Sequence, residues 1–136
     1  MDKKKILVVD DEVGIVDVMQ KRLTHEGYEV ITATDGEEGL KKARSEKPDL
    51  VLLDIFMPKM SGKEVLAALK SGLDTKSIPV IMITGMGDVE EIVKYMTEGK
   101  AEDYIVKPFF TEDLSTKIYS ALFAEVDKKV KRTLEK

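Results

Sequence analysis

The sequence predicts an α/β domain built on a doubly wound, five-stranded parallel sheet. Five short apolar runs recur along the chain: Ile6–Val9, Val30–Ala33, Leu50–Leu53, Val80–Ile83 and Tyr104–Val106. Most of these runs are continuous rather than alternating, which is typical of parallel strands buried on both faces. Segments with helical spacing separate them, and this alternation of strand and helix favours helices on both faces of the sheet. We expect the crossovers to be right-handed.

Apolar residues at three- and four-residue spacing predict five helices. Their stripes are Ile15, Val16, Met19 and Leu23; Leu40 and Ala43; Val65, Leu66 and Leu69; Val89, Ile92, Val93 and Met96; and Leu114, Ile118, Leu122, Val126 and Val130. The last stripe is longer than the helix that a single domain requires, so we predict an extended last helix. We assign residues 1–124 to one domain and residues 125–136 to a C-terminal extension of that helix.

Residues that begin and end helices agree with this order of elements. Gly27 follows the first predicted helix, where a C-terminal glycine is expected. Ser61 stands three residues before Glu64, the spacing of a capping box, and Asp35 stands three residues before Glu38. These signals predict helices that begin near residues 36 and 62.

Length, charge and composition narrow the function. A chain of 136 residues suits one domain. The absence of cysteine excludes disulfides and cysteine-ligated zinc. A net charge of −4 argues against a sequence-independent nucleic-acid binder, and no DNA-binding motif is present. The apolar runs are too short to cross a membrane or to form a signal-peptide core, so we expect a cytoplasmic protein.

Reactive side chains follow four of the five predicted strands. Asp10 and Asp11 follow the first strand, Asp54 the third, Thr84 the fourth and Lys107 the fifth. Parallel strands deliver their carboxyl ends to one edge of the sheet, where ligand sites form. We therefore expect these five side chains to converge, although each alone has a plainer explanation as a cap, a strand residue or a surface charge.

The chemistry of this set points to phosphoryl transfer. Carboxylates about 4 Å apart repel by roughly 4 kcal/mol a pair at an effective dielectric near 20, which a divalent cation would relieve. Oxygen ligands without His or Cys favour Mg²⁺ or Mn²⁺ over zinc. A lysine can neutralise an oxyanion, a hydroxyl can donate to a phosphoryl oxygen, and an aspartate can accept the phosphoryl group.

Four motifs occur in a fixed order: "VVDDE" at Val8–Glu12, "DIFMPKMSG" at Asp54–Gly62, "MITG" at Met82–Gly85 and "DYIVKPF" at Asp103–Phe109. Together they are highly specific, whereas any one alone is weak. With them, the chain from Lys5 to about Ala124 resembles the receiver domain of two-component response regulators. The resemblance implies a flavodoxin-like sheet with strand order 2-1-3-4-5.

The resemblance also implies the parts of the site. Asp54 would be the phosphoacceptor. Mg²⁺, or alternatively Mn²⁺, would be bound by Asp11, Asp54 and the backbone carbonyl of Phe56, with Asp10 acting through a water.

Further roles lie at the ends of the last two strands. Lys107 and Thr84 would contact the phosphoryl oxygens, and Pro108 would follow a cis peptide. Thr84 and Tyr104 would act as the switch, with Tyr104 as the rotating aromatic. Alternatively, Tyr104 is simply a half-buried strand residue with no switch role.

The implied function is a signalling switch that catalyses only its own phosphorylation and dephosphorylation. Its phosphoryl donor would be a sensor histidine kinase. Its output surface would comprise the predicted fourth helix, fifth strand and fifth helix. The C-terminal extension either pairs with a second copy or serves as a linker or a solvated helix.

Two other function classes fit the motifs less well than the switch. An aspartate-nucleophile phosphatase usually has Asp-x-Asp at its nucleophile, whereas Ile55 and Phe56 follow Asp54 here. A flavodoxin-like cofactor carrier needs a Ser/Thr/Gly-rich phosphate loop, whereas "DDEVG" is acidic.

The chain departs from the family pattern in two places. The stretch "MTEGKAEDY" is one residue longer than the usual arrangement, so either Gly99 or Ala101 is the counterpart of the usual pair. Gly85 stands where alanine is commoner and should loosen the loop after Thr84.

Neighbours of the site residues suggest how long a signal would last. Phe56 and Met86 lie two residues past Asp54 and Thr84, and neither offers a hydrogen bond to an attacking water. We hypothesise a long-lived aspartyl phosphate, with Gly85 acting in the opposite direction.

Several other polar residues are expected to have no role in the site. We expect Glu102 and Asp103 to be solvated and His25 to lie on the surface.

Overall fold

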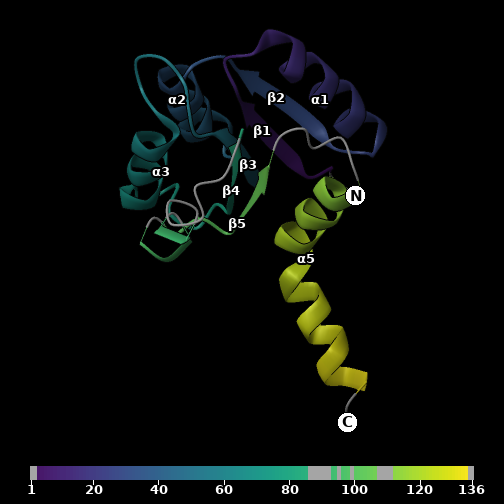
Figure 1. Ribbon diagram of the computed structural model, residues 1–136. Helices are drawn as coiled ribbons and strands as arrows, with labels where there is room; N and C mark the ends of the chain where they lie inside the picture. Colours follow the sequence, from purple (N-terminus) through teal and green to yellow (C-terminus); the bar gives the residue numbers. More distant parts are fainter. Residues whose placement is uncertain (1–2, 86–92, 95, 99, 107–111, 135–136) are drawn as a thin grey trace.

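The chain forms a parallel sheet with helices on both faces (Figure 1). The computed structural model describes residues 3–85, 93–94, 96–98, 100–106 and 112–134, and only the backbone of Thr84, Glu112 and residues 124–132. The strands within these ranges are β1 Lys5–Val9, β2 Glu29–Ala33, β3 Leu50–Asp54, β4 Val80–Thr84 and β5 Asp103–Val106. The helices with described bounds are α1 Val13–His25, α2 Gly36–Glu46, α3 Gly62–Ser71 and α5 Glu112–Leu134.

The strand order is β2-β1-β3-β4-β5, and every neighbouring pair is parallel. This confirms the predicted order 2-1-3-4-5. Each strand is one residue longer than its apolar run. In β3 and β4 the added residue is the last one, Asp54 and Thr84 respectively. Asp54 pairs with Ile83, and Thr84 pairs with Val106. The sites predicted on different strands therefore share the carboxyl edge of one sheet.

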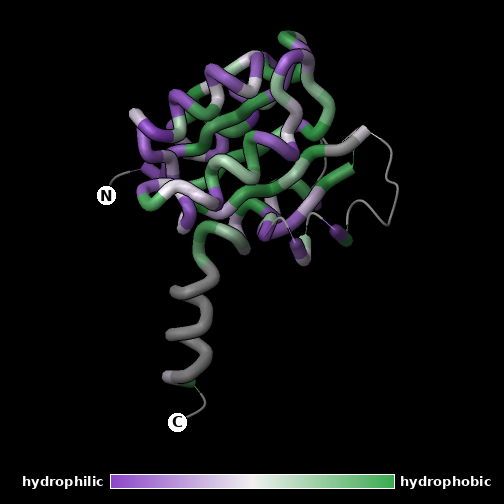
Figure 2. The backbone as a smooth tube through the Cα atoms, turned by 90° about the vertical axis from the view of Figure 1, so that its left-hand side faces the viewer, coloured by the Kyte–Doolittle hydropathy of each residue, from purple (hydrophilic) through white to green (hydrophobic). Residues whose placement is uncertain are grey.

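Alternating residues of the strands contribute their side chains to two hydrophobic clusters, one on each face of the sheet. In Figure 2 the strands form much of the hydrophobic centre of the fold. One cluster includes Leu7, Val9, Val51 and Leu53 with Ala43 of α2 and Val65, Leu66 and Leu69 of α3. The other includes Ile6, Val8, Leu50 and Leu52 with Met19 and Leu23 of α1 and Leu114 and Ile118 of α5. We call these sides the α2/α3 face and the α1/α5 face.

The predicted helix ends are confirmed. The Asp35 carboxylate accepts a 2.7 Å hydrogen bond from the backbone N–H of Glu38 at the start of α2. Ser61 and Glu64 form a full capping box at the start of α3. Gly27 has φ +100° just after α1, a conformation that glycine adopts without strain.

Helix α5 is interrupted at Phe123, whose φ of −120° and ψ of 16° are not helical. The ring of Phe123 packs against Tyr119, with 4.7 Å between ring centroids, and the Lys4 Nζ lies 5.9 Å from its centroid. Figure 1 shows the helix continuing away from the sheet beyond this point. The predicted extension of the last helix is confirmed, since α5 runs to Leu134, whereas the break at Phe123 was not predicted. The boundary predicted after residue 124 stays a prediction.

The predicted fourth helix lies largely outside the described residues. Within its span, residues 93, 94, 96 and 97 are helical, and the Thr97 hydroxyl donates to the carbonyl of Val93 at 2.9 Å. Four of the five predicted helices are thus present with described bounds.

Candidate functional site

Three carboxylates meet at the carboxyl edge of the sheet. Asp10, Asp11 and Asp54 each offer one oxygen, and these three oxygens lie within 4.8 Å of one another. The sheet explains the meeting. Asp10 directly follows β1, Asp54 is the last residue of β3, and β1 and β3 are neighbouring parallel strands.

Burial divides the three carboxylates into two kinds. Asp10 is 0% exposed and Asp54 is 3% exposed, whereas Asp11 is exposed. Asp10 also shapes the turn into α1, because its Oδ1 accepts a 3.0 Å hydrogen bond from the backbone N–H of Glu12. Glu12 is the N-cap residue of α1 and makes no side-chain cap hydrogen bond of its own. The site thus has a buried floor of two carboxylates and an opening at Asp11.

The chain after Asp54 is folded back tightly. The N–H of Ile55 donates to the carbonyl of Ile83 at 3.0 Å, and the N–H of Gly62 donates to the carbonyl of Ile55 at 2.9 Å. Residues 55–62 therefore form a closed loop between β3 and α3. Within that loop the side chain of Phe56 is 64% exposed. An apolar ring thus stands in solvent two residues beyond the buried Asp54.

The structure describes the other predicted residues of the site only in part. Thr84 ends β4 and pairs with Val106, the residue before Lys107. The backbone of β4 thus brings Thr84 to the strand end that carries Lys107 in the sequence. Lys107, Pro108 and Met86 lie outside the described residues, and no side-chain contact of Thr84 is described.

Tyr104 on β5 is half-buried and packs against the cluster on the α2/α3 face. Lys117 of α5 donates to its carbonyl oxygen at 2.6 Å. Asp103, expected to be solvated, is instead half-buried and lies 3.3 Å from Lys117 Nζ. Sequence reasoning missed both Asp103 and Lys117, because the two residues are 14 positions apart in the chain and no local pattern signals their contact.

The donor set at the edge of the sheet fits a hard divalent cation. It offers only carboxylate oxygens, two of them on buried side chains, and no nitrogen or sulfur. Among the residues that the structure describes, no other three His, Cys, Asp or Glu side chains come together in this way. Gathered negative charge of this kind is stabilised by a cation.

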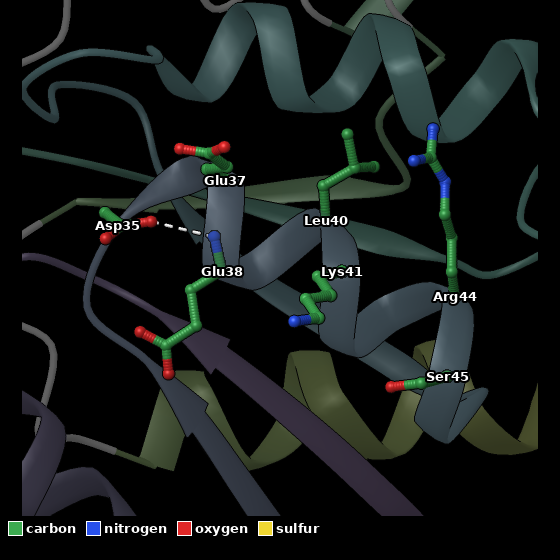
Figure 3. Close-up of a pocket in the computed structure, with 7 residues that line it drawn as sticks. All are labelled: Asp35, Glu37, Glu38, Leu40, Lys41, Arg44 and Ser45. Atoms are coloured by element: carbon green, nitrogen blue, oxygen red, sulfur yellow. Dashed lines mark hydrogen bonds between the residues drawn. The ribbon is translucent and has the colours of Figure 1, made fainter.

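A shallow hollow elsewhere has no comparable chemistry (Figure 3). All its lining residues come from α2 and its N-cap, and its acidic and basic side chains point in different directions: Asp35, Glu37, Glu38, Leu40, Lys41, Arg44 and Ser45. The one interaction drawn there is the helix cap between Asp35 and Glu38. Its contacts therefore indicate helix capping and surface charge rather than a second reactive centre.

Across the described ranges, no helix combines the length and the apolar character that crossing a membrane requires.

The chain is similar in sequence and in fold to known proteins. The family model described as "Response regulator receiver domain" matches residues 6–119. Among solved structures, a CheY-like receiver domain protein of Methanospirillum hungatei JF-1 superposes with a TM-score of 0.85 at 35% identity, covering 93% of this chain and 99% of that one. The chemotaxis protein CheY4 of Vibrio cholerae gives a TM-score of 0.84 at 33% identity, covering 89% of this chain and 100% of that one.

Curated relatives are longer. The probable transcriptional regulator ycf27 of Cyanophora paradoxa is 47% identical over 90% of this chain and 49% of its own length. The alkaline phosphatase synthesis transcriptional regulatory protein PhoP of Bacillus subtilis (strain 168) is 44% identical over 88% of this chain and 48% of its own length. The chain thus spans about half the length of the curated relatives it matches.

Proposed function

Because this chain belongs to the response regulator receiver domain family of two-component systems, we propose that it is a switch controlled by phosphorylation of Asp54. One observation carries the proposal. Asp54 is buried at the carboxyl end of β3, and its carboxylate lies within 4.8 Å of those of Asp10 and Asp11. A carboxylate so placed is at a shared edge of the sheet, beside two groups suited to a cation.

The proposed reaction transfers a phosphoryl group from a phosphohistidine of a sensor histidine kinase. A carboxylate oxygen of Asp54 attacks the phosphorus, forming a P–O bond as the P–N bond to the imidazole breaks. The electron pair of the broken bond stays on the imidazole nitrogen. Hydrolysis of the resulting acyl phosphate later restores the aspartate. The chain is therefore proposed to catalyse only its own phosphorylation and dephosphorylation.

The carboxylates would hold Mg²⁺, with Mn²⁺ as an alternative. Asp11, Asp54 and the backbone carbonyl of Phe56 are the proposed direct ligands, and Asp10 would act through a water. When bound, the ion supplies positive charge against the phosphoryl oxygens. The buried Asp10 also holds the start of α1 through the N–H of Glu12, so the proposed ligand set is tied to the fold.

Two more residues complete the proposed site. Lys107 would neutralise a phosphoryl oxygen as a point charge, and the Thr84 hydroxyl would donate to another. The pairing of Thr84 with Val106 supports this, because Lys107 follows Val106 directly.

The phosphoryl group would act on the fold by adding nearly two negative charges and three acceptor oxygens. Thr84 would move toward it and Tyr104 would turn inward to fill the space. The surface formed by β5, α5 and the segment between β4 and β5 would then change. Such a change only re-weights existing conformations, so the output needs a partner that prefers one of them.

That partner is proposed to be a separate output protein, an output module of a longer chain, or a second copy. A second copy would use the surface around β5 and α5 or the end of α5. The matched relatives carry the word regulator in their names and are about twice as long. We propose that residues 1–136 make no nucleic-acid contact themselves, because their net charge is −4. We also propose that the protein is cytoplasmic.

The experiment is labelling with acetyl phosphate, read on a phosphate-affinity gel. Wild type should give a shifted band with Mg²⁺ and none with EDTA. Asp54→Asn should give no shifted band, whereas Asp74→Asn, which changes an exposed acid in the α3–β4 connection, should label as wild type does. Persistent labelling of Asp54→Asn would overturn the assignment.

A further inference from the structure

Lys117 contacts the backbone of Tyr104 directly at its carbonyl oxygen and, through the side chain of Asp103, at its N–H. Its Nζ donates to the Tyr104 carbonyl at 2.6 Å and to the Asp103 Oδ1 at 3.3 Å. The same Oδ1 accepts a 2.8 Å hydrogen bond from the backbone N–H of Tyr104. Asp113 adds a weaker ion pair at 3.9 Å. The ammonium group thus has a fixed place beside β5, and the side chain of Lys117 is only 22% exposed.

The same nitrogen also lies 4.6 Å from the centroid of the Tyr104 ring. A cation this close to an aromatic face is attracted by the ring quadrupole, most strongly where water is partly excluded. The contacts of Lys117 differ in what they depend on. Its hydrogen bond goes to the backbone of Tyr104, whereas its ring contact requires one orientation of the side chain. Turning the ring would keep the first contact and lose the second.

We infer that Lys117 is a positioning residue, which holds the Tyr104 ring in its half-buried orientation and opposes its turn further into the core. The inference rests on the proposed switch role of Tyr104. A contact made in only one of two orientations shifts the balance between them by its own free energy. Phosphorylation would then have to overcome the Lys117 contact before the ring moves.

The test uses the full chain and beryllofluoride, a phosphoryl mimic, in excess Mg²⁺. Lys117→Met keeps a long apolar stem and removes the charge, and it should bind the mimic roughly two- to tenfold more tightly, as loss of a cation–π contact allows. Lys117→Arg keeps a cation within reach of the ring and should bind close to wild type. Unchanged or weaker binding by Lys117→Met would overturn the inference.

A second background separates positioning from a general effect on stability. In Tyr104→Leu there is no ring to hold, so Lys117→Met should leave the affinity for beryllofluoride unchanged. An equal change in both backgrounds would show that Lys117 acts by another route. Ring signals of ¹³C-labelled tyrosine add a direct readout, in which Lys117→Met should shift Tyr104 and spare Tyr28.

Acetyl phosphate labelling distinguishes this inference from the proposed function. Normal labelling of Lys117→Met, with no change in beryllofluoride affinity or ring signals, would remove the role of Lys117 and leave Asp54 as phosphoacceptor. Absence of labelling in wild type would remove the proposed function, while the ring signals would still report whether Lys117 holds Tyr104.

Discussion

Gly62 packs against the strand end that carries Asp54 so closely that no side chain fits. A Cβ built on Gly62 would collide with the carbonyl oxygen of Asp54 and lie 2.8 Å from the Cα of Ile55. Both neighbours are backbone atoms, which cannot move aside as the end of a flexible side chain can. The start of α3 therefore sets the position of Asp54 through direct backbone contact.

Gly62→Ala should lower the free energy of unfolding by about 1–3 kcal/mol, because overpacking against backbone forces the loop to shift. It should also slow labelling by acetyl phosphate, since the shift displaces Asp54. Urea unfolding and the labelling rate measure the two effects. Gly14→Ala is the matched control, because a Cβ there meets nothing within 4 Å. Its stability should be unchanged or higher by up to about 1 kcal/mol. Equal behaviour of the two variants would contradict the proposed role of Gly62.

Asp11→Asn should stabilise the protein in EDTA and remove most of the stabilisation by Mg²⁺. Each carboxylate pair at about 4 Å destabilises the fold by roughly 1 kcal/mol even in water-like surroundings. Removing one such pair should therefore raise the Tm by about 3–5 °C. Affinity for Mg²⁺ should fall at least about tenfold, since even indirect partners of a metal cost that much when removed. Thermal unfolding in EDTA and across a Mg²⁺ titration measures both.

Asp17→Asn provides the control for Asp11→Asn. It removes one exposed acid of α1 outside the cluster, so the net charge changes equally. Its response to Mg²⁺ should match wild type. An Asp11→Asn protein that is still stabilised by Mg²⁺ like wild type would exclude Asp11 as a ligand.

Phe56→Asn, alone and with Met86→Lys, should shorten the lifetime of the phosphorylated protein. One added hydrogen bond to the attacking water, worth about 1 kcal/mol, would speed the decay roughly fivefold. Decay is followed after removal of acetyl phosphate. Leu73→Asn removes another exposed apolar side chain, on the α3–β4 connection, and should decay as wild type does. If Phe56→Asn also decays at the wild-type rate, the long-lifetime hypothesis is wrong.

Beryllofluoride should raise the sedimentation coefficient of the wild-type chain if a second copy is the partner. Val130→Lys should prevent this rise if the end of α5 forms the contact, because the substitution places a charge in the apolar stripe of that helix. The rise should persist if the surface around β5 and α5 forms it. A wild-type chain that stays monomeric with beryllofluoride would exclude pairing and leave the extension as a linker or a solvated helix.

Much of the fold could be predicted because its signals are local. The buried runs, the Asp35 and Ser61 caps and Gly27 each depend on a few neighbouring residues. The meeting of Asp10 with Asp54 could also be predicted, since parallel strands end at one edge whatever the details of packing.

Other features depend on contacts between distant segments. The break at Phe123 coincides with ring packing on Tyr119 and with Lys4 from the start of the chain. Lys117 reaches Asp103 only because α5 lies against β5. Neither contact has a periodic or motif signal, so the sequence did not indicate the break at Phe123 and predicted a solvated Asp103.

The location of the phosphoryl group tests the central claim most directly. Borohydride reduces an aspartyl phosphate to homoserine, so peptide mapping of the reduced protein reports which residue was modified. Protein treated with acetyl phosphate and Mg²⁺ should contain homoserine at position 54 and at no other aspartate. Homoserine at position 10 or 11, or unmodified aspartate at position 54 in protein shown to be phosphorylated, would contradict the account.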